Sequence, residues 1–371
     1  MLINVLAILF GIGWALLTAV VAARREPKPV SLSTVFATGA IVGFGAGLAA
    51  LVIAIPRDGM FAAVHIAYVA ATLGPALLAV IGLAAMRTGR VSRSVRNAVF
   101  IGLMFVPGAL GLWATHIAPF RLQVERVTAE LPCQRAGDDT ITIGVLADIQ
   151  TPTITDYERD ALQRVMDANP DLIVIAGDIQ QSSDFFAELE TFREFFASAQ
   201  APFGVYVVQG DVESLGDMRE LVAGTGVTYL ENEIVEIAIG DRVIGLGGNQ
   251  RAWKLSDPQA MFAELGEAPA EVVTVVLTHR PDVVFDLRGS VDLVIAGHTH
   301  GGQISLPFIG PPVIKSDVPR SVGAGGLHVV DEQTIYLSSG VGIERGDAPQ
   351  VRFLAPPSVG IVTLQSAQSC G

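Results

Sequence analysis

Hydrophobic residues follow two different patterns along this chain. The first third carries four long, almost uninterrupted apolar runs, at 2–23, 32–55, 60–86 and 98–118. About 20 consecutive apolar residues are enough for a helix to cross a bilayer. The first run lacks a basic residue before it and is longer than the ~7–15 residues of a signal-peptide core. We therefore expect four retained transmembrane helices.

Beyond residue 140 the apolar runs are short and alternate with amphipathic stretches. Strand-like runs lie at 144–147, 172–176, 205–208, 272–278 and 291–296, and helical spacing appears at 157–168, 184–199, 215–223 and 258–265. Strand–helix–strand alternation favours parallel pairing. After residue 228 the runs are closer together, which favours a second, mostly antiparallel layer. The pattern predicts an α/β fold of two packed mixed β-sheets flanked by helices, preceded by the four membrane helices.

Charge divides the chain at the same place as hydropathy. Residues 1–121 hold nine Lys and Arg but only two acids, so 122–371 keeps 15 basic and 35 acidic residues, a net charge of −20. We therefore expect a transmembrane anchor over 1–121, a linker over 122–140 and a soluble domain over 141–371. The loops at 24–29 and 87–96 carry the basic residues, which by the positive-inside rule puts both loops in the cytoplasm. The expected location is a cell membrane, multi-pass, with the soluble domain on the extracytoplasmic side.

The chain has two cysteines, Cys133 and Cys370. In an oxidising compartment they could form a disulfide that ties the two ends of the soluble domain together. The alternative is two separate thiols, and spacing alone does not decide between them.

Potential metal ligands follow five of the short apolar runs. They are Asp148, Asp178, Asp211, His279 and the pair His298 and His300. In open α/β sheets, sites form beyond the carboxyl ends of the strands, so these side chains should converge on one edge. Carboxylates mixed with imidazoles suit a pair of Mn, Fe, Zn or similar divalent ions better than calcium.

These motifs, in this order, resemble those of the calcineurin-like metallophosphoesterase superfamily. The family pattern D-x-H, G-D-x-x, G-N-H-D/E, H and G-H-x-H is matched by Asp148-Ile149-Gln150, Gly177-Asp178, Gly210-Asp211-Val212-Glu213, His279 and Gly297-His298-Thr299-His300. The match covers 141–365, and the sequences around His279 and from Gly297 to Gln303 resemble those of the membrane-associated branch. The resemblance implies a metallophosphoesterase sandwich over 141–371.

The resemblance also implies a role for each matched residue. Asp178 would bridge two divalent metal ions. Asp148, Gln150 and His300 would complete the coordination of the first ion, and Asp211, His279 and His298 that of the second. Asp178, Asp211 and His298 would then be the catalytic residues, with a metal-bridging hydroxide attacking a phosphate ester. Glu213, Arg280 and Gln303 are expected to support these ligands, and Asn249 to line the cleft.

Three positions depart from the family pattern. Gln150 stands in place of a histidine, which should weaken the first metal position, and Asp211 replaces a neutral asparagine, which could tighten the second. Val212 stands where many members have a histidine that assists the leaving group, and such general acid assistance is typically worth about 10²–10⁴-fold in rate. The alternative to an enzyme is therefore a catalytically weak or inactive binding or regulatory module at the membrane.

The leading hypothesis is a membrane-anchored, metal-dependent phosphoric ester hydrolase. The anchor favours a phosphodiester that is lipid-linked or derived from the membrane. The expected partners are this substrate and the lipid bilayer. The acidic domain has no basic patch that would indicate nucleic acid, and the sequence does not identify a protein partner.

Overall fold

The computed structural model describes residues 61–135, 137, 139–182, 184–213, 215–249, 258–287, 289 and 291–367. The chain divides into two compact units, Met1–Ile117 with Glu344–Gln350, and Ala118–Ile343 with Val351–Gly371. The predicted spans at 2–23 and 32–55 lie outside the described residues. The described residues therefore test only the second half of the expectation of four transmembrane helices, and there they show two apolar helices.

Two helices in the first unit are long and apolar enough to cross a membrane, Phe61–Arg87 and Val95–Phe120. The second of these contains α3 (Val95–Leu103) and α4 (Val106–His116), and ends with η1 (Ala118–Phe120), which belongs to the second unit. Ser94 caps α3 by accepting a hydrogen bond from the backbone N–H of Asn97. Such a cap satisfies one of the donors that the first turn of a helix leaves open.

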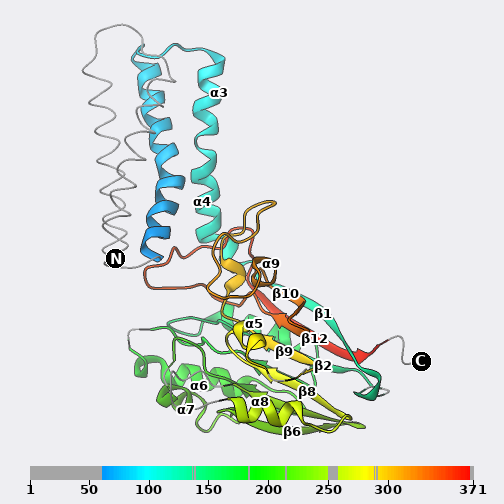
Figure 1. Cartoon of the computed structure of the whole chain (residues 1–371). Coiled ribbons are helices and arrows are strands. Elements are labelled where there is room, and N and C mark those ends of the chain that lie inside the picture. Colours follow the sequence, from blue (N-terminus) through cyan, green and yellow to red (C-terminus); the bar gives the residue numbers. More distant parts are fainter. Residues whose placement is uncertain are drawn as a thin grey trace. The chain divides into compact units, whose positions relative to one another are not determined.

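The second unit is built on two six-stranded mixed sheets (Figure 1). The first sheet has the order β1 (Gln123–Leu131), β12 (Ser358–Ser366), β2 (Ile141–Leu146), β3 (Leu172–Ile175), β4 (Val205–Val207), β5 (Thr228–Tyr229). The second has the order β10 (Gly326–Val330), β11 (Gln333–Leu337), β9 (Leu293–Ala296), β8 (Val272–Leu277), β7 (Arg242–Gly248), β6 (Glu233–Ile239). This arrangement confirms the α/β fold with two mixed sheets.

The second sheet is not mostly antiparallel, and that expectation was wrong. Strands β7, β8, β9 and β11 pair in parallel, and only the flanking pairs β6–β7 and β10–β11 are antiparallel. The connections between the parallel strands are compact; the one from β8 to β9 contains only η4 (Pro281–Phe285). Short spacing between apolar runs therefore does not identify hairpins here.

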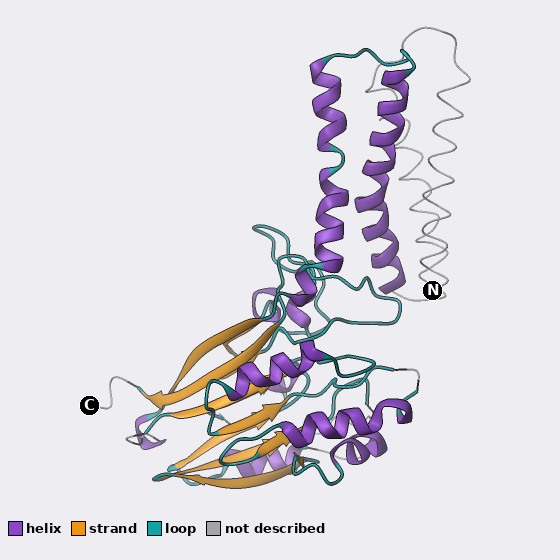
Figure 2. Cartoon of the chain, turned by 180° about the vertical axis from the view of Figure 1, so that it is seen from behind, coloured by secondary structure: helices purple, strands orange, loops and turns teal. Residues whose placement is uncertain are grey.

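Helices cover both outer faces of the sheet pair (Figure 2). The first sheet packs against α5 (Asp156–Met166), α6 (Leu189–Ser198) and α7 (Leu215–Val222), and the second against α8 (Gln259–Gly266) and η4. Each of the four predicted helical stretches overlaps one of these α-helices. Thr155 and Glu158 start α5 with a capping box, in which each side chain bonds the other's backbone N–H.

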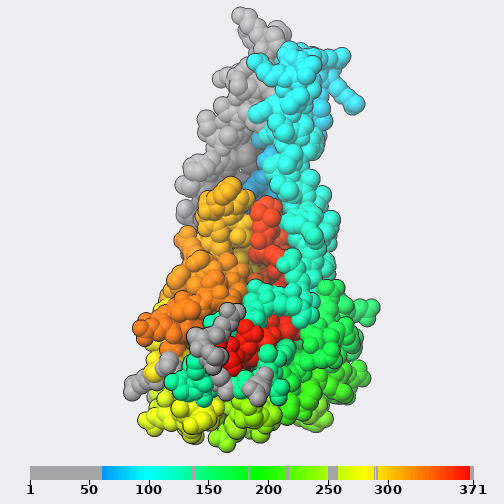
Figure 3. Space-filling model, turned by 90° about the vertical axis from the view of Figure 1, so that its right-hand side faces the viewer, coloured from blue at the N-terminus to red at the C-terminus, as the bar shows by residue number. Residues whose placement is uncertain are grey.

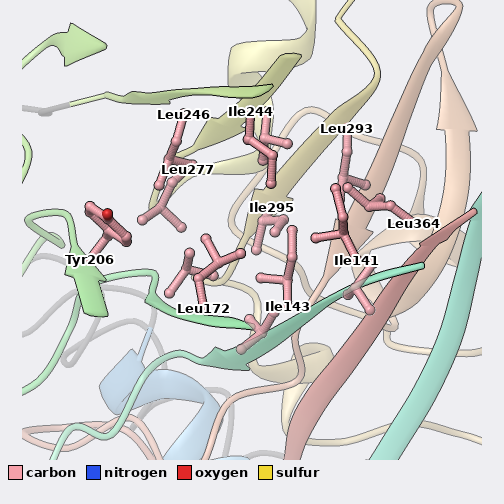
Figure 4. Packing of buried hydrophobic residues seen from close by; sticks show 14 of the residues in the cluster. Ile141, Ile143, Leu172, Tyr206, Ile244, Leu246, Leu277, Leu293, Ile295 and Leu364 are labelled. Carbon is pink, nitrogen blue, oxygen red and sulfur yellow. The ribbon is translucent and has the colours of Figure 1, made fainter. Parts of the chain in front are cut away.

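The main core lies between the two sheets. Residues from β2 such as Ile141 and Ile143 face Leu293 and Ile295 from β9 and Leu246 from β7 (Figure 4). Strands β2, β3 and β9 are buried on both faces, which explains why they appear as continuous apolar runs in the sequence. This rigid double sheet fixes the positions of the loops at its carboxyl ends.

The segment expected to be a linker, 122–140, contains a strand. Residues Gln123–Leu131 form β1, which pairs in parallel with the whole of β12. Ala129 and Leu131 are buried in the core between the sheets. The alternating polar and apolar residues of this strand suit a sheet edge with one covered face. Cys133, two residues later, is disulfide-bonded, and Cys370 lies outside the described residues.

Candidate metal centre

The carboxyl ends of β2, β3, β4, β8 and β9 place the predicted ligands around one point. Asp148 follows β2, Asp178 follows β3 and Asp211 follows β4. His279 follows β8, and His298 and His300 follow β9. Two ligand groups have all their donor atoms within 4.8 Å of one another: Asp211, His279 and His298, and Asp148, Asp178 and His279. His279 belongs to both groups, whereas the sequence assigned it to the second ion alone.

Close backbone packing makes this convergence possible. Gly177 has a φ of +78°, and a Cβ there would lie 2.5 Å from the backbone nitrogen of Gly210. A Cβ on Gly210 would in turn overlap the backbone and carboxylate of Asp178. Only glycine lets the β3 and β4 loops approach this closely.

Five of the seven predicted ligands have left-handed backbone conformations. The φ values are +48° for Asp148, +38° for Gln150, +53° for Asp178, +75° for His298 and +51° for His300. Such conformations cost roughly 1–2 kcal/mol for a residue with a side chain. Strain of this kind collects at functional sites, where the surrounding fold holds it in place.

Asp178 is held from both sides. Its Oδ1 accepts the backbone N–H groups of Asp211 at 2.5 Å and Val212 at 3.0 Å, and its Oδ2 accepts the Gln150 amide at 2.9 Å. The Nε2 atom of His279 lies 3.3 Å from the same Oδ2. Gln150 thus lies in the site, but it presents a donor to the carboxylate expected to bridge.

The two imidazoles of the second group face each other through the nitrogens that make no backbone hydrogen bond. His279 Nδ1 donates to the carbonyl of Ala176 at 2.8 Å, and His298 Nε2 donates to the carbonyl of Lys315 at 2.8 Å. The remaining nitrogens, His279 Nε2 and His298 Nδ1, are 3.2 Å apart, and Asp211 Oδ2 is 3.2 Å from His298 Nδ1. Two neutral acceptors beside a carboxylate need a cation or a proton between them.

His300 completes the other side of the site, near Asp148. Its Nε2 is buried, lies 3.5 Å from Asp148 Oδ1 and has no hydrogen-bond partner among the described residues. Asp148 accepts the backbone N–H of His298 at 2.9 Å. A buried nitrogen facing a buried carboxylate is consistent with a metal ligand.

Burial and neighbouring charges shift the pKa values of several side chains in the site. Burial lowers the pKa of His279, but the carboxylates of Asp178, Asp148 and Asp211 outweigh burial and raise that pKa to about 10. Burial raises the pKa of Asp148, and the neighbouring Asp178 adds to this. Burial and the positive charge of Arg352 hold the pKa of His300 well below its ordinary value. Without a cation the carboxylates therefore hold a proton on His279.

Glu213 and Arg280 support the ligands, as the sequence suggested. The buried carboxylate of Glu213 accepts backbone N–H groups of Asp178 and Gln180 at 3.2 Å and of Gly210 at 3.0 Å, which ties the β3 and β4 loops together. Burial and the charge of Asp178 raise its pKa to about 7. Arg280 pairs with Asp211 at 2.7–3.0 Å through two nitrogens.

Two further positions noted in the sequence, Asn249 and Val212, belong to neither ligand group. Asn249 donates to the Thr278 hydroxyl at 3.2 Å, one residue before His279. Val212 contributes its backbone N–H to Asp178, while its side chain offers no proton. Asn249 is therefore a neighbour of the site rather than part of either ligand group.

Sequence reasoning missed Arg352. This arginine is completely buried; it donates to the carbonyls of His300 at 2.6 Å, Gly342 at 3.1 Å and Gly340 at 3.2 Å. The nitrogen that bonds Gly340, Nη2, also lies 3.4 Å from His300 Nδ1. Burial lowers its pKa to about 10. No strand end or motif precedes it, so the sequence carried no signal.

Comparison with known proteins agrees with this geometry. Residues 141–302 match the family of calcineurin-like phosphoesterases. The chain is 25% identical to the uncharacterized metallophosphoesterase YkuE of Bacillus subtilis, over 73% of this chain and 94% of that protein. It is 31% identical to the phosphodiesterase YaeI of Escherichia coli, over 49% of this chain and 67% of that protein. It is 21% identical to the UDP-2,3-diacylglucosamine pyrophosphatase LpxG of Chlamydia trachomatis, over 69% of this chain and 93% of that protein. The chain therefore belongs to the calcineurin-like phosphoesterase family.

Proposed function

We propose that this protein is a membrane-anchored, metal-dependent phosphoric ester hydrolase that cleaves a phosphodiester or diphosphate of a lipid-linked substrate. The observation that carries the proposal is the convergence of three carboxylates and two imidazoles from both sheets on one point, with His300 Nε2 3.5 Å from Asp148 Oδ1 beside them. Family membership supports hydrolysis of a phosphate ester. The names of two relatives, a phosphodiesterase and a diacylglucosamine pyrophosphatase, support the substrate class.

The donor set fits two divalent cations. Asp148, Asp178 and His300 would hold one, with Gln150 beside it, and Asp178, Asp211, His279 and His298 would hold the other. The fit rests on the facing nitrogens of His279 and His298 and on the buried Nε2 of His300. When bound, such cations neutralise phosphate charge and make water a stronger nucleophile at neutral pH.

The protein's own contribution is to fix each ligand before substrate arrives. Backbone carbonyls hold the rings of His279 and His298, so that the other nitrogen of each ring faces the site and would bind a cation. Glu213 holds the loop of Asp178, and Arg352 holds the backbone of His300. Because Val212 carries no acid, this position cannot protonate a leaving group. We therefore propose that the enzyme acts on esters whose leaving group needs little protonation.

We further propose that the active domain lies on the extracytoplasmic side of a cell membrane. The basic loop at 87–96 supports a cytoplasmic position for the turn between the two described helices. The disulfide at Cys133 supports an oxidising compartment for the domain. Labelling an introduced cysteine at Val329 in intact cells tests the orientation, because this side chain is 72% exposed.

The test of the enzyme is metal content measured together with hydrolysis of bis(p-nitrophenyl) phosphate in the presence of Mn²⁺. Asp178→Asn should lose both metal and at least 10³-fold of the rate, by the order of magnitude expected for a metal-assisted step. Asp160→Asn is the matched control, since Asp160 is half-exposed and pairs only with Arg164 within α5. Equal metal content and rate in Asp178→Asn and the unmodified protein would refute the proposal.

Two observations favour a second candidate, a phosphoesterase-like binding module. Gln150 donates a hydrogen bond to the expected bridging carboxylate, and Arg280 already neutralises Asp211. A module would bind fewer than one metal ion per chain and show no turnover with Mn²⁺. The same elemental analysis and diester assay separate the two functions.

A further inference from the structure

An exposed set of large apolar side chains lies on loops next to the metal centre. We call it the apolar rim: Phe120, Leu306, Phe308, Ile309, Val313 and Leu354. Phe308 is fully exposed and Ile309 is 63% exposed. Exposed apolar patches of this kind mark surfaces that meet another apolar phase.

The loop that carries most of the apolar rim is held in a tight turn. The backbones of Leu306 and Gly310 exchange two hydrogen bonds of 2.9 Å, which places Phe308 and Ile309 at the tip. Phe308 has a φ of +66°, a conformation that a bulky residue rarely adopts. The fold thus holds a phenylalanine outward in water at a cost in strain, although a polar residue or glycine would be more favourable there.

Both ends of this loop are anchored on metal-centre residues. It begins at Gln303, directly after η5 (His300–Gly302), and at its far end the carbonyl of Lys315 accepts the hydrogen bond from His298 Nε2. The loop is therefore fixed at the carboxyl-end edge of the sheets, where the predicted metal ligands lie. Figure 3 shows the segment around residues 305–315, in gold, beside the red-orange segment that leads into β12.

The point where the chain enters from its last apolar helix lies at the same edge. That helix ends at Phe120, and Gln123 pairs with Ser358 at the start of β12, which runs antiparallel to β2. Phe353, five residues earlier, exchanges backbone hydrogen bonds of 2.8 Å with Gln303 and Ser305. Five residues span at most about 18 Å. The start of β1 and the loop that carries the apolar rim therefore lie at the same edge of the second unit.

Charge near the apolar rim points to lipid rather than to a second copy of the chain. Arg121, Lys315 and Arg320 are exposed on or beside the segments that carry it, together with the acidic Asp317, whereas residues 122–371 as a whole have a net charge of −20. An apolar tip with basic neighbours is the pattern of a segment that lies in a membrane interface. Two copies of so acidic a domain would repel each other.

We propose that the apolar rim inserts into the bilayer that holds the protein's own helices, so that the metal centre works at the level of the lipid headgroups. The insertion stands on the apolar rim and the chain path; the benefit for a lipid-linked phosphodiester rests on the proposed function. Phe308 and Ile309 would lie among acyl chains, while Lys315 and Arg320 would lie near headgroup phosphates.

The test of insertion uses the full chain in lipid nanodiscs that hold one copy each. Phe308→Cys is labelled with the environment-sensitive fluorophore NBD without reductant, and doxyl-labelled lipid is added as a quencher. Val329→Cys is the control, because Val329 is also an exposed apolar residue but lies toward the end of β10 away from the metal centre. We expect at least threefold stronger lipid quenching at 308 than at 329. Equal lipid quenching, with equal quenching by aqueous iodide, would overturn the proposal, whether the true partner is a protein or none.

A second measurement links insertion to turnover. The double variant Phe308→Asp with Ile309→Asp should lower the ratio of hydrolysis of a vesicle-embedded phosphodiester lipid to hydrolysis of bis(p-nitrophenyl) phosphate on the order of tenfold. An unchanged ratio would show that the apolar rim does not bring the centre to lipid. If the unmodified protein cleaves neither substrate, the proposed function fails, and the quenching result alone decides insertion.

Discussion

Arg352 illustrates how a residue outside every motif can position a predicted ligand. Its guanidinium is completely buried and holds carbonyls of three chain positions, among them that of His300. Its positive charge also helps to keep the imidazole of His300 neutral, the form that a metal ligand requires.

Arg352→Met should destabilise the protein by about 3–5 kcal/mol, because it leaves buried carbonyls without a donor. It should also lower metal retention, since the His300 loop loses its support. Urea unfolding and elemental analysis measure the two effects. Arg164→Met is the control, as Arg164 is 42% exposed. If Arg352→Met retained metal and stability as the control does, the positioning role would be wrong.

Metal binding should release protons. The metal-free site holds a proton on His279, whose pKa is raised to about 10 by the adjoining carboxylates, and a metal must displace it. Apparent Mn²⁺ affinity should therefore rise with pH between 6 and 8. Calorimetric titration in two buffers of different ionisation enthalpy counts the released protons. Identical heats in both buffers would contradict the expected protonation.

The seven positions predicted as ligands stand out in the sequence because each follows an apolar run that forms a buried strand. The fold brings their side chains together because parallel strands end at one edge of each sheet. Arg352 could not be found this way, since its surroundings, Val351 and Phe353, lie outside any strand. Its role depends on a long-range contact that no local pattern encodes.

At the scale of elements, the close approach of the β3 and β4 loops brings Asp178 of one ligand group next to Asp211 of the other. Gly210→Ala would push a methyl group against the Asp178 carboxylate and backbone. Overpacking of this kind costs typically about 1–3 kcal/mol. We expect reduced thermal stability and loss of metal. Gly224→Ala is a strict control, because it has positive φ but nothing within 4 Å of the added Cβ; metal loss in both variants would refute the explanation.

The strand pairing of the second sheet could not be predicted from the spacing of the apolar runs. Short apolar runs predicted where strands lie, yet not how they connect. Strand β9 lies between β8 and β11, and the antiparallel hairpins occur only at the two ends of the sheet. The strand direction was misjudged because the parallel connection from β8 to β9, residues 278–292, is short and carries η4 in place of a longer helix.

At the scale of the whole molecule, β1 makes the segment after the helices part of the phosphoesterase fold. A chain that starts at residue 118 should melt cooperatively. A chain that starts at 141 should lose stability, because the removal of β1 exposes the edge of β12 and the apolar surface beside Leu131. Differential scanning calorimetry of the two chains measures this. Equal melting temperatures would restore the view of 122–140 as a linker.

The central claim is that Asp178 joins two cations in one centre, and electron paramagnetic resonance of the Mn²⁺-loaded protein tests it most directly. Two Mn²⁺ ions about 3.5–4 Å apart are spin-coupled and give a multiline spectrum. We predict that spectrum for the unmodified protein and its disappearance in Asp178→Asn. A spectrum of isolated Mn²⁺ alone, the same in both proteins, would contradict the account.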